Sequence, residues 1–86
     1  MVKKKILIIE DEATLLKALT EFLTLEGMEI ISAMDGEKGL AMAKSELPDL
    51  ILLDIILPKK DGYAVLDEVK KDEKTKNIPV ILLTNL

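Results

Sequence analysis

Four short apolar runs recur along the chain, separated by longer segments in which apolar and charged residues are mixed. The runs are rich in isoleucine, leucine and valine, and three of them are continuously apolar rather than alternating. This pattern is typical of strands that are buried on both faces of a parallel sheet. We therefore predict four strands, at Ile6 to Ile9, Met28 to Ala33, Leu50 to Leu53 and Val80 to Leu83.

The three segments between the runs predict helices, because their apolar residues recur three or four positions apart. The first helix ends before Gly27, and its expected inner face comprises Leu15, Leu16, Leu19, Phe22 and Leu23. The second begins after an Asp35 N-cap and ends at Pro48, with an expected inner face of Gly36, Leu40, Ala43 and Leu47. The third begins after an Asp61 N-cap and turns inward Val65, Leu66 and Val69. Residues 72–77 then form a charged loop.

Strands and helices thus alternate along 86 residues, which is the length of one domain. Such an order implies an α/β fold with a parallel sheet, right-handed crossovers and helices on both faces. The last strand lies close to the end of the chain, so we expect it to form an exposed, apolar edge of the sheet.

Composition narrows the chemistry that this domain can perform. Apolar residues make up 49% of the chain, which suits a folded globule. The net charge is −4 and all 12 basic residues are lysine, so we do not expect nucleic acid as a partner. The chain has no cysteine or histidine, which excludes disulfides, thiolate or imidazole metal sites and Ser-His-Asp catalysis. Carboxylates, hydroxyls, lysines and backbone groups remain.

Targeting signals are not evident in the sequence. The apolar run after the first lysines ends at Ile9, which is short for a signal peptide, and no run has the length of a membrane span. We therefore expect a cytoplasmic protein without a membrane partner.

Polar, oxygen-bearing residues follow three of the four predicted strands: Glu10 and Asp11, then Asp54, then Thr84 and Asn85. Each one alone could simply solubilise a strand end or cap a helix. The carboxyl ends of parallel strands, however, lie along one edge of the sheet, where ligands bind. We therefore expect these residues to share one cleft.

Carboxylates that lie close together repel one another, and a hard cation with oxygen ligands relieves that repulsion. Mg²⁺ suits a site with few protein ligands, because it keeps several waters and often binds substrate phosphate. A carboxylate can itself act as the nucleophile and form an aspartyl phosphate. The strand ends therefore indicate Mg²⁺-dependent phosphoryl chemistry.

Three segments resemble the motif regions of the receiver domain of two-component response regulators: Ile6 to Glu12, Leu52 to Gly62 and Ile78 to Thr84. The D-x-x-L-P-x-x-D-G pattern that begins at Asp54 is the most specific of them. The resemblance implies a flavodoxin-like, doubly wound parallel sheet, here with four strands in the order 2-1-3-4 and three helices. It also implies a signalling role, with a histidine kinase or a small phosphodonor as the source of phosphate.

The resemblance also assigns roles to individual residues of the cleft. Asp54 would be the phosphoacceptor, and Asp11 the main metal ligand with Glu10 beside it. The backbone carbonyl of Ile56 would be a further ligand for Mg²⁺. Thr84 would donate a hydrogen bond to the phosphoryl group, and the amide of Asn85 could add another.

The family pattern continues with a further helix, a fifth strand ending in a lysine, and a final helix, which residues 1–86 do not include. We therefore expect one partial receiver domain. Lys59 and Lys60 follow the nucleophile in sequence, and we expect both to be solvated loop charges rather than substitutes for that lysine.

Three functions remain open at this point. The first is a phosphoacceptor that is not itself an enzyme. The second is a receiver fragment, impaired in phosphorylation, that acts as a self-associating structural module. The third is a phosphohydrolase of the haloacid-dehalogenase kind, which usually needs a second acid where this chain has Ile56. We also expect a homodimer, formed through the edge strand Val80 to Leu83 or by exchange of elements between two copies.

Overall fold

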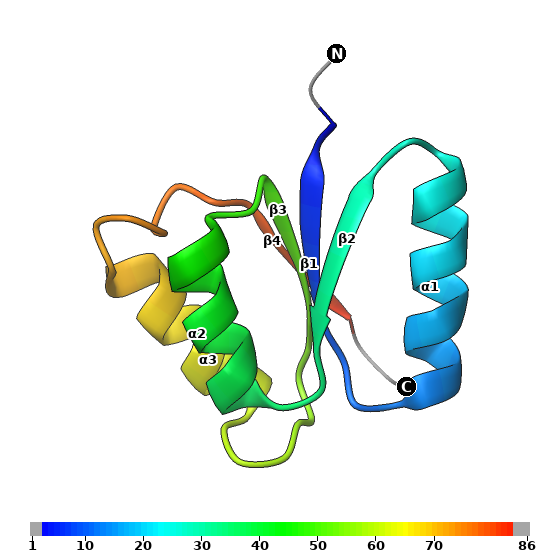
Figure 1. Ribbon diagram of the computed structural model, residues 1–86. Coiled ribbons are helices and arrows are strands. Elements are labelled where there is room, and N and C mark those ends of the chain that lie inside the picture. Colours follow the sequence, from blue (N-terminus) through cyan, green and yellow to red (C-terminus); the bar gives the residue numbers. More distant parts are fainter. Residues whose placement is uncertain (1–2, 84–86) are drawn as a thin grey trace.

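The computed structural model describes residues 3–83, which form a four-stranded sheet with helices on both faces (Figure 1). The elements in chain order are β1 (Lys5–Ile9), α1 (Ala13–Leu25), β2 (Glu29–Ala33), α2 (Gly36–Glu46), β3 (Leu50–Asp54), α3 (Gly62–Lys71) and β4 (Val80–Leu83). In this part of the chain, none of the three helices combines the length and the apolar character that crossing a membrane requires.

All neighbouring strands are parallel, and the order in the sheet is β2-β1-β3-β4. This confirms the doubly wound fold and the strand order that the sequence predicts. Three strands differ from the prediction by one residue at one end: β1 begins at Lys5 rather than Ile6, β2 begins at Glu29 rather than Met28, and β3 ends at Asp54 rather than Leu53. The central strands β1 and β3 are paired so that Ile9 lies opposite Leu53. The residues that follow these two, Glu10 and Asp54, therefore leave the sheet side by side.

Alternation along the strands divides the core into two apolar layers, one on each face of the sheet. Helices α2 and α3 cover one face, and α1 covers the other (Figure 1). The α2 and α3 side buries Leu7, Ile9, Leu40, Ala43, Ile51, Leu53, Val65 and Val69. The α1 side buries Ile6, Ile8 and Leu52, against which Leu16, Leu19 and Leu23 of α1 pack. The central strands β1 and β3 supply most of the buried residues of both layers.

Helix α1 begins at an unexpected cap and buries fewer residues than predicted. The side chain of Glu12 accepts hydrogen bonds from the backbone N–H groups of Thr14 (3.1 Å) and Leu15 (2.8 Å). The prediction that Leu15 and Phe22 face inward is wrong, since they are 42% and 61% exposed. They lie on the flank of the helix beside the buried stripe, where the described part of the sheet does not reach. Gly27, with φ of 88°, follows the end of the helix as predicted.

Helix α2 begins as predicted, since the side chain of Asp35 accepts a hydrogen bond from the backbone N–H of Lys38 at 2.7 Å. The prediction that Leu47 lies on its inner face is wrong. Leu47 is the C-cap residue, is 52% exposed and has a left-handed conformation with φ of 45°. The physical reason is Pro48, because the residue before a proline is sterically disfavoured in the α conformation.

Helix α3 begins as predicted, since the side chain of Asp61 accepts a hydrogen bond from the backbone N–H of Ala64 at 2.9 Å.

The segment between α3 and β4 is held by side chains that donate hydrogen bonds to backbone carbonyls. Thr75 is fully buried, and its hydroxyl donates to the Val69 carbonyl at 2.7 Å. The ammonium of Lys70 donates to the Ile78 carbonyl at 2.7 Å. These two bonds fix the path of the predicted charged loop.

Thr75 offers a test of this arrangement. Thr75→Val keeps the shape of the side chain but leaves the buried carbonyl of Val69 without its donor, so we expect the free energy of unfolding to fall by about 1–3 kcal/mol. Urea unfolding measures this change. Thr75→Ser, which keeps the hydroxyl, should lose less, and equal losses in both variants would contradict the role of the hydrogen bond.

Candidate functional site

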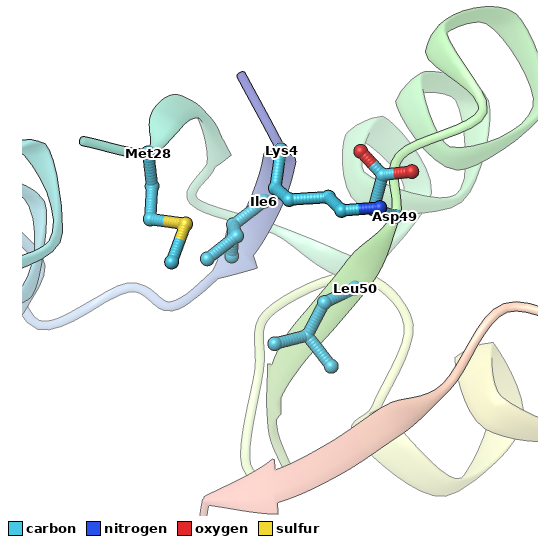
Figure 2. Close-up of a pocket in the computed structure, with 5 residues that line it drawn as sticks. All are labelled: Lys4, Ile6, Met28, Asp49 and Leu50. Atoms are coloured by element: carbon cyan, nitrogen blue, oxygen red, sulfur yellow. The ribbon is translucent and has the colours of Figure 1, made fainter. Parts of the chain in front are cut away.

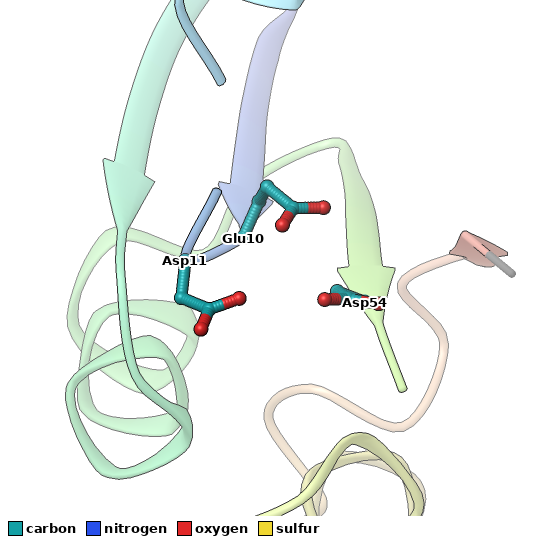
Figure 3. Close-up of side chains that lie close together, drawn as sticks. All are labelled: Glu10, Asp11 and Asp54. Carbon is teal, nitrogen blue, oxygen red and sulfur yellow. The ribbon is translucent and has the colours of Figure 1, made fainter. Parts of the chain in front are cut away.

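Three carboxylates meet at the carboxyl edge of the sheet (Figure 3). Glu10 and Asp11 directly follow β1, and Asp54 is the last residue of β3. One oxygen of each lies within 4.8 Å of the others, as the parallel register of β1 and β3 requires. They line a cleft of about 290 Å³ together with Glu12 and Ile56. The expected convergence of these strand ends is therefore present in the structure, although it does not test the roles assigned to the residues.

Burial and mutual repulsion act most strongly on Glu10. Its side chain is 3% exposed, and it accepts a hydrogen bond from the backbone N–H of Glu12 at 2.9 Å. Burial raises the pKa of Glu10 above its ordinary value of 4.5, and the neighbouring carboxyls of Asp54 and Asp11 raise it further. The hydrogen bond from Glu12 opposes this shift. The cleft thus disfavours a full set of negative charges unless a cation joins them.

The donor set of the cleft fits Mg²⁺. All of its charged ligand atoms are carboxylate oxygens, which hard divalent cations prefer. Within residues 3–83, no lysine forms an ion pair with Glu10, Asp11 or Asp54. Glu10 and Asp54 are buried, whereas Asp11 is exposed, which leaves one side of the cleft open to water and to a substrate. Glu10, Asp11 and Asp54 could therefore hold the ion, with the carbonyl of Ile56 as a further candidate ligand.

The loop after Asp54 turns back tightly under the end of β3. The backbone N–H of Gly62 donates to the Ile55 carbonyl at 2.7 Å. A Cβ atom at position 62 would overlap the carbonyl oxygen of Asp54 and lie 2.6 Å from the Cα atom of Ile55, so only glycine permits this approach. The final glycine of the D-x-x-L-P-x-x-D-G pattern is thus a steric requirement of this turn.

The two lysines of this loop differ from each other. Lys59 is exposed and has a left-handed conformation with φ of 69°. Lys60 is a partly exposed loop residue, and its ammonium lies 2.6 Å from a carboxylate oxygen of Glu68 on α3, so its charge is paired at the surface. This hydrogen bond and the charge of Glu68 raise the pKa of Lys60. Lys60 is thereby turned toward α3.

Three further residues bear on the site: Thr84 and Asn85, which were predicted, and Glu12, which was not. Thr84 and Asn85 lie outside the described residues, so their expected hydrogen bonds to a phosphoryl group stay predictions. Glu12, which lines the cleft and caps α1, was not predicted, because glutamate is not among the preferred N-cap residues. Its position directly before the helical periodicity was the signal that could have identified it.

The opposite edge of the sheet has a different character. A cleft of about 220 Å³ lies there, lined by Lys4, Ile6, Met28, Asp49 and Leu50 (Figure 2). Most of its exposed lining is apolar, and only one carboxylate borders it. The chemistry of the described residues is therefore concentrated at the carboxyl edge.

Comparison with known proteins identifies the family. The family model for the response regulator receiver domain matches residues 6–86 of the sequence. The chain is 44% identical over 86 residues to the probable transcriptional regulator ycf27 of Porphyridium aerugineum, covering 100% of this chain and 35% of that protein. It spans about a third of the length of the ycf27 relatives that it matches.

Solved structures agree with this match. One is the receiver domain of the sensor histidine kinase PA1611 from Pseudomonas aeruginosa PAO1, with a magnesium ion coordinated in its active-site cleft (TM-score 0.92, 29% identity, 96% of this chain and 68% of that chain). Another is the phosphorylated cyanobacterial phytochrome response regulator RcpA (TM-score 0.86, 38% identity, 99% and 67%). With the family model matched over nearly the whole chain, the chain belongs to the response regulator receiver domains of two-component systems.

Proposed function

We propose that this chain accepts a phosphoryl group on Asp54, from a histidine kinase or a small phosphodonor, with Mg²⁺ bound beside it. The observation that carries this proposal is the convergence of Glu10, Asp11 and Asp54 within 4.8 Å at the carboxyl edge. The magnesium ion in the PA1611 receiver domain and the phosphorylated state of RcpA support it by similarity.

In this proposal Asp54 is the nucleophile. One of its carboxylate oxygens forms a bond to the phosphorus of the donor, while the bond from phosphorus to the leaving group breaks and the leaving group keeps the electron pair. Bound Mg²⁺ would supply positive charge that offsets the charge on the transferring group. Glu10 and Asp11 would hold the ion, and the exposed side of the cleft at Asp11 would admit the donor. Thr84 would donate a hydrogen bond to the phosphoryl oxygens.

The product of this reaction stays on the protein, so we propose a phosphoacceptor rather than a turnover enzyme. The haloacid-dehalogenase alternative usually places a second acid two residues after the nucleophile, where this chain has Ile56. A histidine kinase takes its phosphate from ATP, so the proposal places the chain in the cytoplasm. The probable transcriptional regulator ycf27 is about three times as long as this chain, so its regulatory output is not assigned to this chain.

We also propose that the 86-residue chain forms a homodimer. Strand β4 is an edge of the described sheet, and its four residues, Val80 to Leu83, are all apolar. Ile81 is 51% exposed. Unpaired N–H and C=O groups on an apolar edge favour pairing with another strand, and two-fold symmetry would place two β4 strands antiparallel. Exchange of elements between two copies is the other geometry that gives a dimer.

The phosphoacceptor role predicts a single modified residue. Incubation with acetyl phosphate and Mg²⁺ should add one phosphoryl group to Asp54, which mass spectrometry of the intact chain and of its peptides detects. Asp54→Asn should remain unmodified, because its amide is not a nucleophile of this kind. Phosphate on Asp54→Asn, or on wild type after EDTA treatment, would contradict the proposal.

The carboxylate cluster predicts how stability depends on pH without metal. Because the pKa of Glu10 is raised in the fold, its ionisation destabilises the fold as pH rises above the ordinary value of 4.5. In EDTA we therefore expect Glu10→Gln to unfold at higher urea concentration than wild type near neutral pH.

The gain from Glu10→Gln should shrink as pH falls toward 4.5 and disappear below it, because wild-type Glu10 is then protonated in both the folded and the unfolded state. Saturating Mg²⁺ should stabilise wild type more than this variant. Glu21→Gln, on the exposed side of α1, removes the same charge and should show neither effect. A gain from Glu10→Gln that persists unchanged at low pH would be inconsistent with repulsion as its cause.

The dimer proposal is tested by light scattering coupled to size exclusion. We expect twice the chain mass of 9.6 kDa at low micromolar concentration. Ile81→Lys places a charge on the edge and should give the monomer. Leu25→Lys, which introduces the same charge at an 87% exposed position on α1, should remain dimeric. A wild-type mass near 9.6 kDa would refute the dimer.

A further inference from the structure

The loop between β3 and α3, residues 55–61, carries the candidate metal-binding carbonyl of Ile56 and follows Asp54 directly. Leu57 packs against the core, but its neighbours do not: Ile56 is 73% exposed and Pro58 is also exposed. A backbone carbonyl can ligate a metal well only if the loop that carries it is held in place.

One contact comes from the start of α2, an element that contributes no ligand. The backbone N–H of Gly36 donates to the carbonyl of Pro58 at 3.2 Å, and Lys60 N–H donates to the same carbonyl at 2.8 Å. Figure 1 shows the loop beneath the carboxyl edge of the sheet, near the first turn of α2. The middle of the loop is thus hydrogen-bonded to the first residue of α2.

Gly36 is also in close steric contact with this loop. A Cβ atom at position 36 would overlap the carbonyl oxygen of Lys60, and would lie 2.7 Å from its carbonyl carbon and 2.8 Å from its Cβ. Two of these three neighbours are backbone atoms, which cannot rotate away as the end of a side chain can. The ion pair of Lys60 with Glu68 holds the same residue from the side of α3. Any larger residue at position 36 must therefore push the loop away.

We propose that Gly36 is a positioning residue of the metal site: by lacking a side chain, it lets the 55–61 loop seat against α2 and so places the Ile56 carbonyl beside Asp54. This inference rests on the proposed Mg²⁺ site and adds a residue from outside the cleft to it. Gly36 touches no ligand atom and acts only through the loop.

The test measures Mg²⁺ affinity of the 86-residue chain by NMR titration, following the amide resonances of Asp11 and Ile56. Gly36→Ala should bind Mg²⁺ about tenfold more weakly than wild type, as is usual when a group that orients a ligand is lost. Before any metal is added, the amides of residues 55–61 should already be shifted relative to wild type.

Gly27→Ala is the matched control. It makes the same substitution at a glycine with φ of 88°, so it destabilises the fold through the backbone while nothing lies within 4 Å of the added Cβ. It should keep the Mg²⁺ affinity of wild type. If Gly27→Ala loses as much affinity as Gly36→Ala, the effect is general destabilisation and the positioning role is refuted.

A second variant covers the case in which Gly36→Ala does not fold. Pro58→Ala changes an exposed residue and only loosens the backbone of the seated loop, so it should fold and bind Mg²⁺ more weakly than wild type. Wild-type affinity in both Gly36→Ala and Pro58→Ala would overturn the inference. If wild type does not bind Mg²⁺, or if Asp11→Asn binds it as tightly as wild type, the proposed metal site itself is refuted.

Discussion

Electrostatic repulsion among three carboxylates is the constraint on which the rest of this structure depends. Glu10 and Asp54 leave adjacent parallel strands at the same level, and Asp11 follows at once, so the register of β1 and β3 forces like charges together. Burial makes this costlier, as the raised pKa of Glu10 records. A cluster of this kind persists only where the surrounding fold is stable enough to hold it, and it favours whatever cation can bind there.

The architecture supplies that stability at a position close to the charges. Ile8 and Ile9 precede Glu10, and Leu52 and Leu53 precede Asp54, and all four are buried. The apolar layers on both faces of the sheet therefore end one residue before the carboxylates begin. The backbone at the cluster cannot relax outward without exposing these side chains to water, at a cost of roughly 25 cal/mol for each Å² of apolar surface. Apolar packing thus holds the charges in a geometry that they would not adopt alone.

Much of the fold and of the site could be predicted because both depend on period and order. Continuous apolar strands identify a parallel sheet, and in such a sheet Glu10, Asp11 and Asp54 must share an edge, whatever the details of packing. The incorrect predictions concern how much of each helix face is buried against the sheet. Leu15, Phe22 and Leu47 match the helical period, yet the period does not say where the sheet stops or where a proline changes the backbone.

The remaining features could not be predicted because they depend on contacts between segments distant in sequence. Lys60 pairs with Glu68 only because the loop and α3 fold back on each other, and nothing in the spacing of Gly36 reveals that Lys60 lies against it. These contacts differ in kind from those of the strands. The strands place Glu10 and Asp54 through buried side chains, whereas the loop after Asp54 is placed through close backbone approach at Gly36 and Gly62. The buried carboxylates are therefore positioned by the apolar core, whereas the more exposed loop beside them is positioned by backbone contacts with the first residues of α2 and α3.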